Sequence, residues 1–221
     1  MKRLIKIVMG AALLGISFSA RASDNPAMDD AIARLQHEWA NIKYKIIDKD
    51  AQLEQMEALA RQADGVVKRY ADRAEPLIWD AIITSTQAGM KGGFSALGKA
   101  KAARRMLEAA QKIDPKALNG SAETSLGSLY YQVPGFPIGF GSNKKARRYL
   151  EQALAINPDG IDPNYFYGDF LYSRGEYQKA AQVLRHALDA PARPQRPLAD
   201  QGRRREIRDL LAKIQRKIAS R

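Results

Sequence analysis

The region between Met28 and Tyr70 places apolar residues at the three- and four-residue spacing of one α-helix face. The first stripe consists of Met28, Ile32, Leu35, Trp39, Ile42 and Ile46, and the second of Leu53, Met56, Leu59 and Val66 or Val67. These stripes predict two helices that fold as an antiparallel hairpin within residues 23–75. A dimerising coiled coil is the alternative interpretation, although the first stripe covers fewer than three heptads, which is short for a coiled coil.

The chain beyond this hairpin repeats itself. A shift of 43 residues aligns eleven identical pairs: Gly92 with Gly135, Gly98 with Gly141, Lys101 with Lys144, Ala103 with Ala146, Arg104 with Arg147, Arg105 with Arg148, Leu107 with Leu150, Glu108 with Glu151, Ala110 with Ala153, Ile113 with Ile156 and Pro115 with Pro158. A shift of 34 residues aligns six further pairs: Gly141 with Gly175, Lys145 with Lys179, Ala146 with Ala180, Leu150 with Leu184, Ala153 with Ala187 and Leu154 with Leu188. Because the two shifts share one frame, we infer three copies of one unit, at residues 76–118, 119–159 and 160–192.

Small residues and a closing proline recur within these copies. They are Gly168, Gly175, Ala180, Ala187 and Pro191 in the last copy, and Gly127, Ala146, Ala153 and Pro158 in the middle one. A 34-residue helix–turn–helix unit with this pattern resembles the tetratricopeptide repeat (TPR). Small residues let two helices approach closely, and proline ends a helix. The resemblance implies an all-α fold, a short α-solenoid of TPR-like hairpins that follows the N-terminal helical pair.

The first two copies depart from the 34-residue pattern by nine extra residues, the difference between the two shifts of 43 and 34, and these residues precede Gly98 and Gly141. The inserted segments, 89–94 and 133–140, are rich in glycine or proline, which disfavour helix. We therefore predict two ordered loops on one edge of the array, each between the helices of a hairpin. Inserts at equivalent places in a solenoid often lie on its binding face.

The end of the chain, residues 193–221, combines a turn-rich linker with a final helix from about Leu198 to Ala219. Its apolar residues at helical spacing are Ile207, Leu210, Leu211, Ile214 and Ile218, and its basic residues include Arg203, Arg204, Arg205, Arg208, Lys213, Arg216 and Lys217. This pattern predicts the solubilising cap that the end of a solenoid needs. A basic amphipathic helix also suits an anionic membrane surface, which is the alternative role.

Residues 1–22 have the features of a secretory signal peptide, with a positive start, an apolar stretch at 7–19 and the small-x-small site Ala20-Arg21-Ala22. The apolar run is too short for a transmembrane helix, which needs about 20 residues. The chain has no cysteine, so neither a lipid-modified cysteine nor a disulfide is possible. We expect a soluble protein that begins at Ser23, is not a lipoprotein, and is periplasmic if the source is a Gram-negative bacterium.

The formal net charge is +12, and it falls to +8 when the four basic residues of the predicted signal peptide are removed. A basic chain often binds nucleic acid, but the predicted export argues against nucleic acid as a partner. Anionic lipid, a cell-wall polymer and an acidic protein are left as candidates. Much of the excess charge can also be ordinary solvated surface.

Residues that could carry catalysis or hold a metal are few. The two histidines, His37 and His186, stand far apart in the predicted array, and no metal-ligand spacing or nucleophile motif is present. The segment 139–144 lacks the preceding strand and the Gly-Lys-Ser or Gly-Lys-Thr ending of a phosphate-binding loop. Asp162, which precedes a proline, is expected to cap the next helix. The sequence therefore predicts no enzyme activity, no cofactor and no metal site.

The TPR resemblance implies that the first helix of each repeat lines a concave groove. The candidate binding residues on that face are Thr124, Ser128 and Tyr131 in the middle copy, and Tyr165, Asp169 and Tyr172 in the last copy. A tyrosine has a large apolar face and a polar tip, which suits a peptide, a sugar or an elongated small molecule. Packing against neighbouring helices is the alternative role for the tyrosines of the last copy. Phe136 and Phe140 of the second insert either cover the groove as a lid or anchor a long loop.

The resemblance implies an exported, non-enzymatic scaffold that holds a protein or peptide in its concave groove. The repeats and their inserts are also similar, more loosely, to the T component of TRAP-type transporters, which implies a periplasmic small-molecule carrier or an accessory subunit. An enclosed apolar cavity would favour the carrier, and an open wet groove would favour the scaffold. A structural protein of the cell wall or membrane surface is a third class, suggested by the basic final helix.

Overall fold

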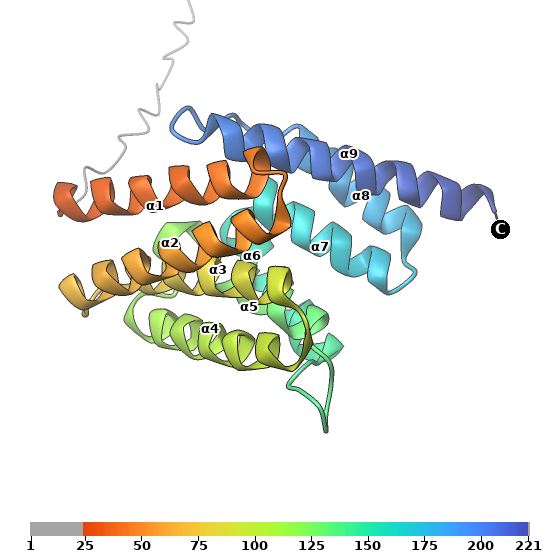
Figure 1. Ribbon diagram of the computed structural model, residues 1–221. Coiled ribbons are helices and arrows are strands. Elements are labelled where there is room, and N and C mark those ends of the chain that lie inside the picture. Colours follow the sequence, from red (N-terminus) through yellow and green to blue (C-terminus); the bar gives the residue numbers. More distant parts are fainter. Residues whose placement is uncertain (1–23, 221) are drawn as a thin grey trace, which may run out of the picture.

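The computed structural model describes residues 24–220, which form nine α-helices and one short 3-10 helix (Figure 1). The elements are α1 (Pro26–Lys45), α2 (Lys49–Arg69), α3 (Ala74–Lys91), α4 (Gly93–Ile113), η1 (Ala117–Asn119), α5 (Ser121–Gln132), α6 (Asn143–Ile156), α7 (Ile161–Ser173), α8 (Tyr177–Leu188) and α9 (Pro197–Ala219). This part of the chain contains no β-strand, only an isolated bridge between Gly135 and Gly141. The predicted all-α fold is confirmed, and the predicted signal peptide lies outside the described residues.

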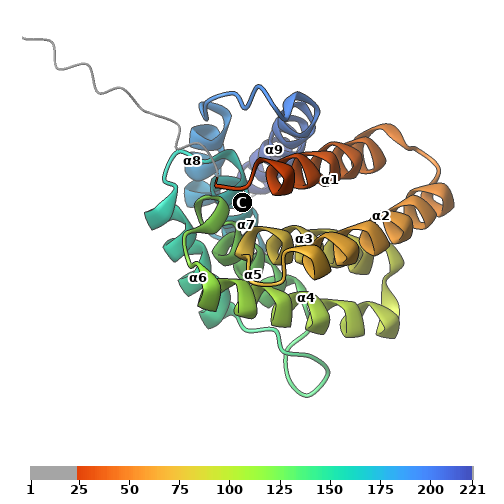
Figure 2. The same ribbon diagram turned by 90° about the vertical axis from the view of Figure 1, so that its left-hand side faces the viewer.

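Three helical hairpins, α3–α4, α5–α6 and α7–α8, form the body of the molecule (Figures 1 and 2). The first helices of the hairpins contact one another in order, α3 with α5 and α5 with α7, and form the inner layer. The second helices, α4, α6 and α8, lie on the outside (Figure 2). This arrangement is the short α-solenoid that the internal repeats predict.

A glycine facing a leucine sets the distance between the two helices in the second and third hairpins. A Cβ atom on Gly127 would lie 2.5 Å from Cγ of Leu150, and one on Gly168 would lie 2.6 Å from Cγ of Leu184. Both leucines are fully buried. Because no side chain larger than hydrogen fits at either position, these glycines are needed for close packing within each hairpin.

The first insert does not form the predicted loop. α3 runs to Lys91 and α4 begins at Gly93, so only Gly92 separates them, and its φ of +63° makes the turn. The extra residues lengthen the two helices instead, because the segment contains no proline and a glycine weakens a helix without ending it. The second insert does form a loop, between α5 and α6, since Pro134 and Pro137 cannot continue a helix.

The two ends of the described chain meet, because α1 packs against α9 as well as against α2 and α3 (Figure 2). Nζ of Lys43 lies 2.9 Å from Oε1 of Glu206, and Tyr44 packs directly on Gly202, where a Cβ would approach its ring to 2.5 Å. The α1 stripe is buried within the same chain from Met28 to Ile42. The stripe therefore serves an intramolecular contact and is not left free for a dimerising coiled coil.

α9 covers the last repeat, as its amphipathic pattern predicts. Ile207, Leu210 and Ile214 are buried in the same hydrophobic cluster as the helices of the repeats. Among the described residues, no helix is long and apolar enough to cross a membrane. Because Ile207, Leu210 and Ile214 pack on the repeats, most of the apolar face of α9 is not free for the alternative role of this helix at a membrane surface.

We expect Gly127→Ala to lower the free energy of unfolding by about 1–3 kcal/mol, because the added methyl group must push α5 away from Leu150. Chemical denaturation monitored by circular dichroism measures the change. The matched control is Gly65→Ala in α2, where a Cβ would have no neighbour within 4 Å. This control should raise stability by about 0.5–1 kcal/mol, the helix-propensity difference between the residues. Similar effects of the two substitutions would contradict the close-packing argument.

Asp80 of α3 provides a second test, because it is a buried carboxyl that accepts a hydrogen bond of 3.3 Å from Thr84. Burial raises the pKa of Asp80 to about 6. The folded state thus binds this proton more tightly than the unfolded chain, so the group destabilises the fold as pH rises from about 4 to about 6. Asp80→Asn should stabilise the protein by about 1–3 kcal/mol more at pH 7 than at pH 4 in urea titrations. An equal effect at both pH values would contradict the raised pKa.

Candidate functional site

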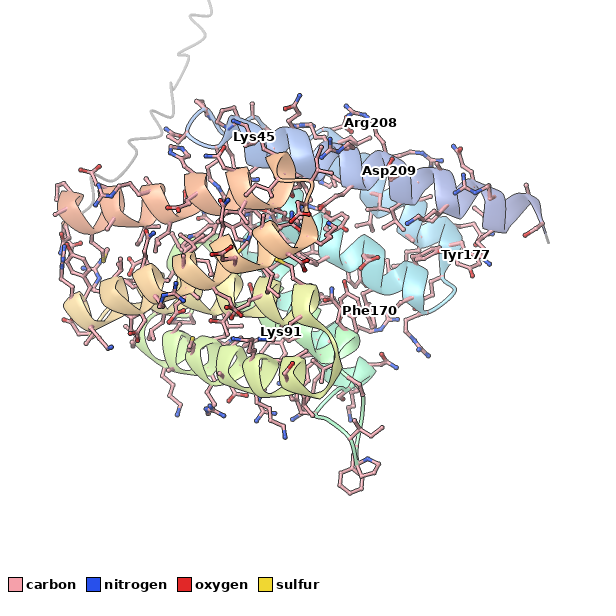
Figure 3. The ribbon with its side chains drawn as sticks, in the orientation of Figure 1. Lys45, Lys91, Phe170, Tyr177, Arg208 and Asp209 are labelled. Carbon is pink, nitrogen blue, oxygen red and sulfur yellow. The ribbon has the colours of Figure 1, made fainter. Side chains whose placement is uncertain are left out.

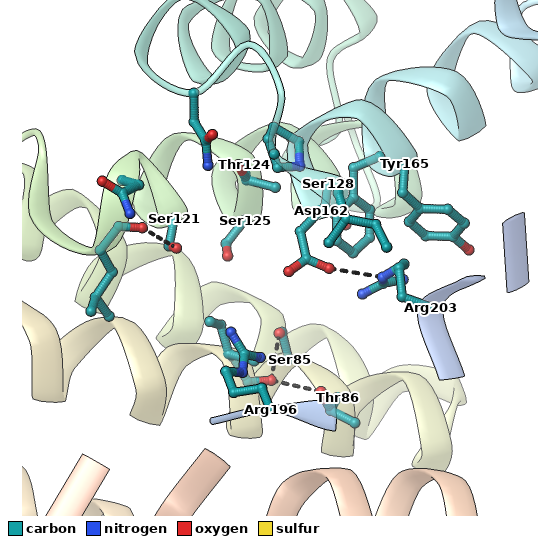
Figure 4. Close-up of a pocket in the computed structure, with 18 of the residues that line it drawn as sticks. Ser85, Thr86, Ser121, Thr124, Ser125, Ser128, Asp162, Tyr165, Arg196 and Arg203 are labelled. Carbon is teal, nitrogen blue, oxygen red and sulfur yellow. Dashed lines mark hydrogen bonds and ion pairs between the residues drawn. The ribbon is translucent and has the colours of Figure 1, made fainter. Parts of the chain in front are cut away.

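The inner layer of the solenoid lines a central pocket of about 610 Å³ that is partly open to solvent (Figure 4). Its walls come from α1, α3, α5 and α7, from the linker between α8 and α9, and from the start of α9. The pocket exists because the first helices of the repeats form a concave surface and because α1 and α9 close that surface from the other side. We call it the central pocket.

One wall of the central pocket is lined by hydroxyl groups. They belong to Ser85, Thr86, Ser121, Ser125 and Ser128 (Figure 4). The hydroxyls of Ser85 and Thr86 donate to the carbonyl of Ile82, and Ser121 donates to Leu118. In the part of the chain that the structure describes, no hydrogen bond involves the hydroxyls of Ser125 and Ser128. This wall can therefore both donate and accept hydrogen bonds to a bound molecule.

Two tryptophans give the pocket an aromatic side. The rings of Trp39 and Trp79 meet edge to face with centroids 6.1 Å apart. Nε1 of Trp39 donates a 3.0 Å hydrogen bond to the hydroxyl of Thr86, which fixes the orientation of its ring. The guanidinium of Arg196 lies over the Trp79 ring at 5.0 Å from the centroid, a cation–π contact.

A cluster of ion pairs, in which Arg203 and Asp200 are buried and the other members are half-buried, closes the pocket at the end formed by α7 and α9. Asp162 accepts hydrogen bonds from Nε of Arg203 at 2.8 Å and from Nη1 of Arg193 at 2.7 Å. Arg203 also donates to Glu206 at 2.6 Å, and Arg193 to Asp200 at 2.7 Å. Burial alone would raise the pKa of Asp162, but Arg203 and Arg193 hold this pKa well below its usual range. The cluster therefore stays ionised and links α7, the linker and α9.

Arg196, at the same end of the pocket, forms no ion pair among the described residues, unlike Arg193 and Arg203. Its Nε is buried and has no hydrogen-bond partner among the described residues. Burial, with Arg193 and Arg203 nearby, lowers the pKa of Arg196, while Asp162 opposes this effect. A buried donor on a charged group without a partner is unusual and unfavourable. The pocket thus contains a cationic group that an anion could satisfy.

The structure separates the six groove residues of the sequence prediction into two groups. Thr124, Ser128 and Tyr165 line the central pocket. Tyr131 instead donates a 2.6 Å hydrogen bond to Asp169, and Tyr172 packs on Tyr177 at a centroid distance of 5.6 Å, so these three lie outside the pocket. The groove is not open along its length, because the guanidinium of Arg203 covers Tyr165 at 4.2 Å from the ring centroid.

The two phenylalanines of the second insert do not line the pocket. Phe140 packs edge to face on Tyr130 at 5.5 Å and lies under the guanidinium of Arg104 at 4.5 Å, so it anchors the loop. Phe136 is 93% exposed at the loop tip. Neither residue covers the central pocket as a lid, which corrects that interpretation of the insert.

Several residues that line the pocket were not predicted from the sequence as site residues. Asp162 does not cap its helix; the cap position is Gly160, and Asp162 in the first turn forms ion pairs instead. Arg193 and Arg196 belong to a linker that the sequence predicts only as turn-rich. Their positive charge within a proline-rich segment was the one sequence feature that could have marked them as candidate site residues. Trp39 was assigned to a core stripe. The described residues contain no group of three or more side chains suited to a metal ion.

Residues 138–214 match the model of the tetratricopeptide repeat, a stretch that covers α6 to α8 and most of α9. In fold the chain is similar to a thermophilic TPR protein from Thermus thermophilus, with a TM-score of 0.51 and 16% identity over 79% of this chain and 98% of that chain. It also matches the structure of PilF from Pseudomonas aeruginosa, with a TM-score of 0.35 and 15% identity over 85% of this chain and 90% of that chain. A TM-score of 0.35 does not establish a common fold. No curated protein matches the sequence.

These likenesses confirm the TPR resemblance and the helical-repeat fold. Tetratricopeptide repeats generally mediate interactions between proteins and are generally not enzymes. Protein binding is therefore the general role that this fold supports.

Removal of the Asp162 carboxylate tests whether the ion cluster holds α9 against α7. We expect Asp162→Asn to lower the free energy of unfolding by about 1–3 kcal/mol, because it leaves the buried Arg203 and the half-buried Arg193 without their carboxylate. Amide hydrogen exchange should increase first in α9, whose contact with α7 depends on this pair. The control is Asp159→Asn, which removes an exposed pair with His186 and should change stability by less than about 0.5 kcal/mol. Unchanged exchange in α9 would contradict the proposed link.

Proposed function

We propose that this protein is an exported, non-enzymatic scaffold that binds a short acidic segment of a partner protein in its central pocket. The TPR fold supports a protein partner in general terms. The predicted signal peptide supports export to the periplasm without a lipid anchor. The nature of the bound segment follows from the pocket.

The size and closure of the pocket limit what can enter. A volume of about 610 Å³ lies in the range of a small ligand or a few amino-acid side chains. Arg203 and the rest of α9 cover the inner face of the last repeat, so a long peptide cannot run along the whole concave surface. A chain end, a loop tip or one or two side chains of a partner fit this space.

The charge of the pocket favours an acidic segment, and the observation that carries this conclusion is that Arg196, which lines the pocket, forms no ion pair among the described residues, whereas Arg193 and Arg203 do. An Asp or Glu side chain that enters the pocket would pair its carboxylate with the guanidinium of Arg196, which lines the pocket, and a charge-assisted bond is stronger than a neutral one. Arg196, Ser85 and Thr86 all line the central pocket (Figure 4). The hydroxyl wall can bind the peptide groups on either side of the acidic residue, and the tryptophans can contact its apolar parts.

A small-molecule carrier is the second candidate, and the partial closure of the pocket by α1 and α9 favours it. An anionic metabolite would satisfy Arg196 as well as an acidic side chain does. The periplasmic carrier or accessory subunit of a TRAP-type system belongs to this class. The pocket is lined by both polar and apolar groups, which is common for sites that fix a ligand by a few polar contacts.

Affinity capture from the native periplasm, after mild crosslinking, distinguishes the two functions when both proteins and extractable small molecules are analysed by mass spectrometry. We expect one stoichiometric protein partner, and its yield should fall about ten-fold or more in Arg196→Gln, the loss expected for a charged hydrogen bond. A retained small anion without a protein partner would move the carrier into first place.

The matched control is Arg205→Gln, because Arg205 is an exposed arginine of α9 that does not line the pocket. Circular dichroism should show that both variants are folded. Equal yields of the partner from Arg196→Gln and Arg205→Gln would contradict a role of the central pocket in binding.

A further inference from the structure

The loop between α5 and α6, residues 133–142, protrudes from the outer side of the molecule (Figures 1 and 2). Its tip carries Phe136, which is 93% exposed, and Ile138, which is 61% exposed. Two large apolar side chains on one protruding tip are unfavourable in water and typical of an interaction site. Neither the scaffold fold nor the central pocket uses this tip.

The loop holds the tip in a defined position. The N–H of Gly139 donates to the carbonyl of Gly135 at 3.0 Å, and the N–H of Gly141 donates to Pro134 at 2.9 Å. A Cβ on Gly141 would meet the backbone oxygen of Val133, so the two arms of the loop lie against each other. Phe140 fastens the base of the loop to Tyr130 and Arg104. The exposure of Phe136 is therefore a property of a folded loop.

Basic residues surround the base of the loop. α4 and α6 together carry nine basic and two acidic residues, a net charge of +7, whereas the rest of residues 24–220 contains as many acidic as basic side chains. Figure 3 shows nitrogen-tipped side chains projecting outward from α4, on the side where the loop protrudes. Lys101, Lys144 and Lys145 of these two helices are exposed. The loop tip and the two helices form what we call the basic outer face.

An anionic lipid bilayer matches both features of the basic outer face. Its headgroups attract the lysines and arginines, and its interfacial region accepts an aromatic and a branched apolar side chain. Nucleic acid or an acidic polymer would satisfy the charges but offer nothing to Ile138. The alternative membrane contact through α9 lacks a free apolar face, since Ile207, Leu210 and Ile214 are buried.

We propose that the basic outer face docks on anionic lipid bilayers, with Phe136 and Ile138 inserted at the interface. The central pocket lies among the inner helices, whereas α4 and α6 are outer helices, so the pocket stays accessible while the protein is attached. This attachment is independent of what the pocket binds.

Vesicle sedimentation tests the proposal with the chain that begins at Ser23, which contains the whole described fold. The protein should bind vesicles of phosphatidylglycerol and phosphatidylcholine, but not vesicles of phosphatidylcholine alone, and about 0.5 M salt should release most of it. Phe136→Ser with Ile138→Ser should weaken binding about ten-fold or more, because the apolar insertion is lost. The control is Ile47→Ser, which removes a side chain that is 91% exposed on a different loop and should leave binding unchanged.

Removal of positive charge and tryptophan fluorescence test membrane binding independently of sedimentation of the apolar variants. Lys101→Gln, Lys144→Gln and Lys145→Gln together should weaken binding about ten-fold or more, whereas the same number of substitutions in α9, at Lys213, Arg216 and Lys217, should have a smaller effect. In Phe136→Trp, the added tryptophan should show a blue shift on binding, while the parent protein, with Trp39 and Trp79 buried, should not. Circular dichroism checks that each variant is folded.

Three results would overturn the proposal. The first is no binding to anionic vesicles, and the second is equal binding by the parent and the Phe136→Ser, Ile138→Ser variant. The third is that the lysine variant loses vesicle binding while the Phe136→Ser, Ile138→Ser variant keeps it, and that the lysine variant loses binding to a soluble acidic polymer such as heparin to the same extent. That result would assign the basic outer face to an acidic polymer instead.

Discussion

Asp162 of α7 is bound by Arg203 of α9 and by Arg193 of the linker, and the closure of the molecule depends on this largely buried contact. The guanidinium of Arg203 also stacks on Tyr165, so α9 is held across the inner face of the last repeat. A buried ion pair adds little net stability, because both groups lose their water, but it strongly disfavours arrangements that separate them. Its effect here is to select one position of α9.

The position of α9 decides the shape of the binding surface. Because α9 turns inward, it meets α1, and the contacts of Lys43 with Glu206 and of Tyr44 with Gly202 join the two ends of the described chain. An array that would otherwise present an open groove therefore contains a pocket. Closure also brings Arg196 over Trp79, where it loses water without gaining a hydrogen-bond partner for its Nε among the described residues.

The inner and outer layers of the solenoid carry different chemistry. The first helices turn hydroxyl and aromatic groups toward the pocket, whereas α4 and α6 carry the excess positive charge of the described residues outward. The repeat pattern explains this division, because every second helix of a hairpin has one face on its partner and the other in water. A ligand inside and a charged surface outside can thus be bound without competing for the same residues.

The sequence by itself determined the features that rest on short-range packing. The small residues Gly127 and Gly168 indicated that two helices approach closely, and Pro134 and Pro137 specified a loop, whereas the leucines that face these glycines were identified only in the structure. The first insert was predicted wrongly, because Gly92 and Gly93, both with positive φ, suffice for the turn and the flanking residues are compatible with helix.

The tertiary structure alone decided the central pocket, the role of Asp162 and the exposure of Phe136. These features depend on residues far apart in the chain, such as Asp162 and Arg203, and on how the array curves. A local pattern of apolar and polar positions does not encode these long-range contacts or the curvature of the array, because both are set by contacts between helices that are distant in sequence.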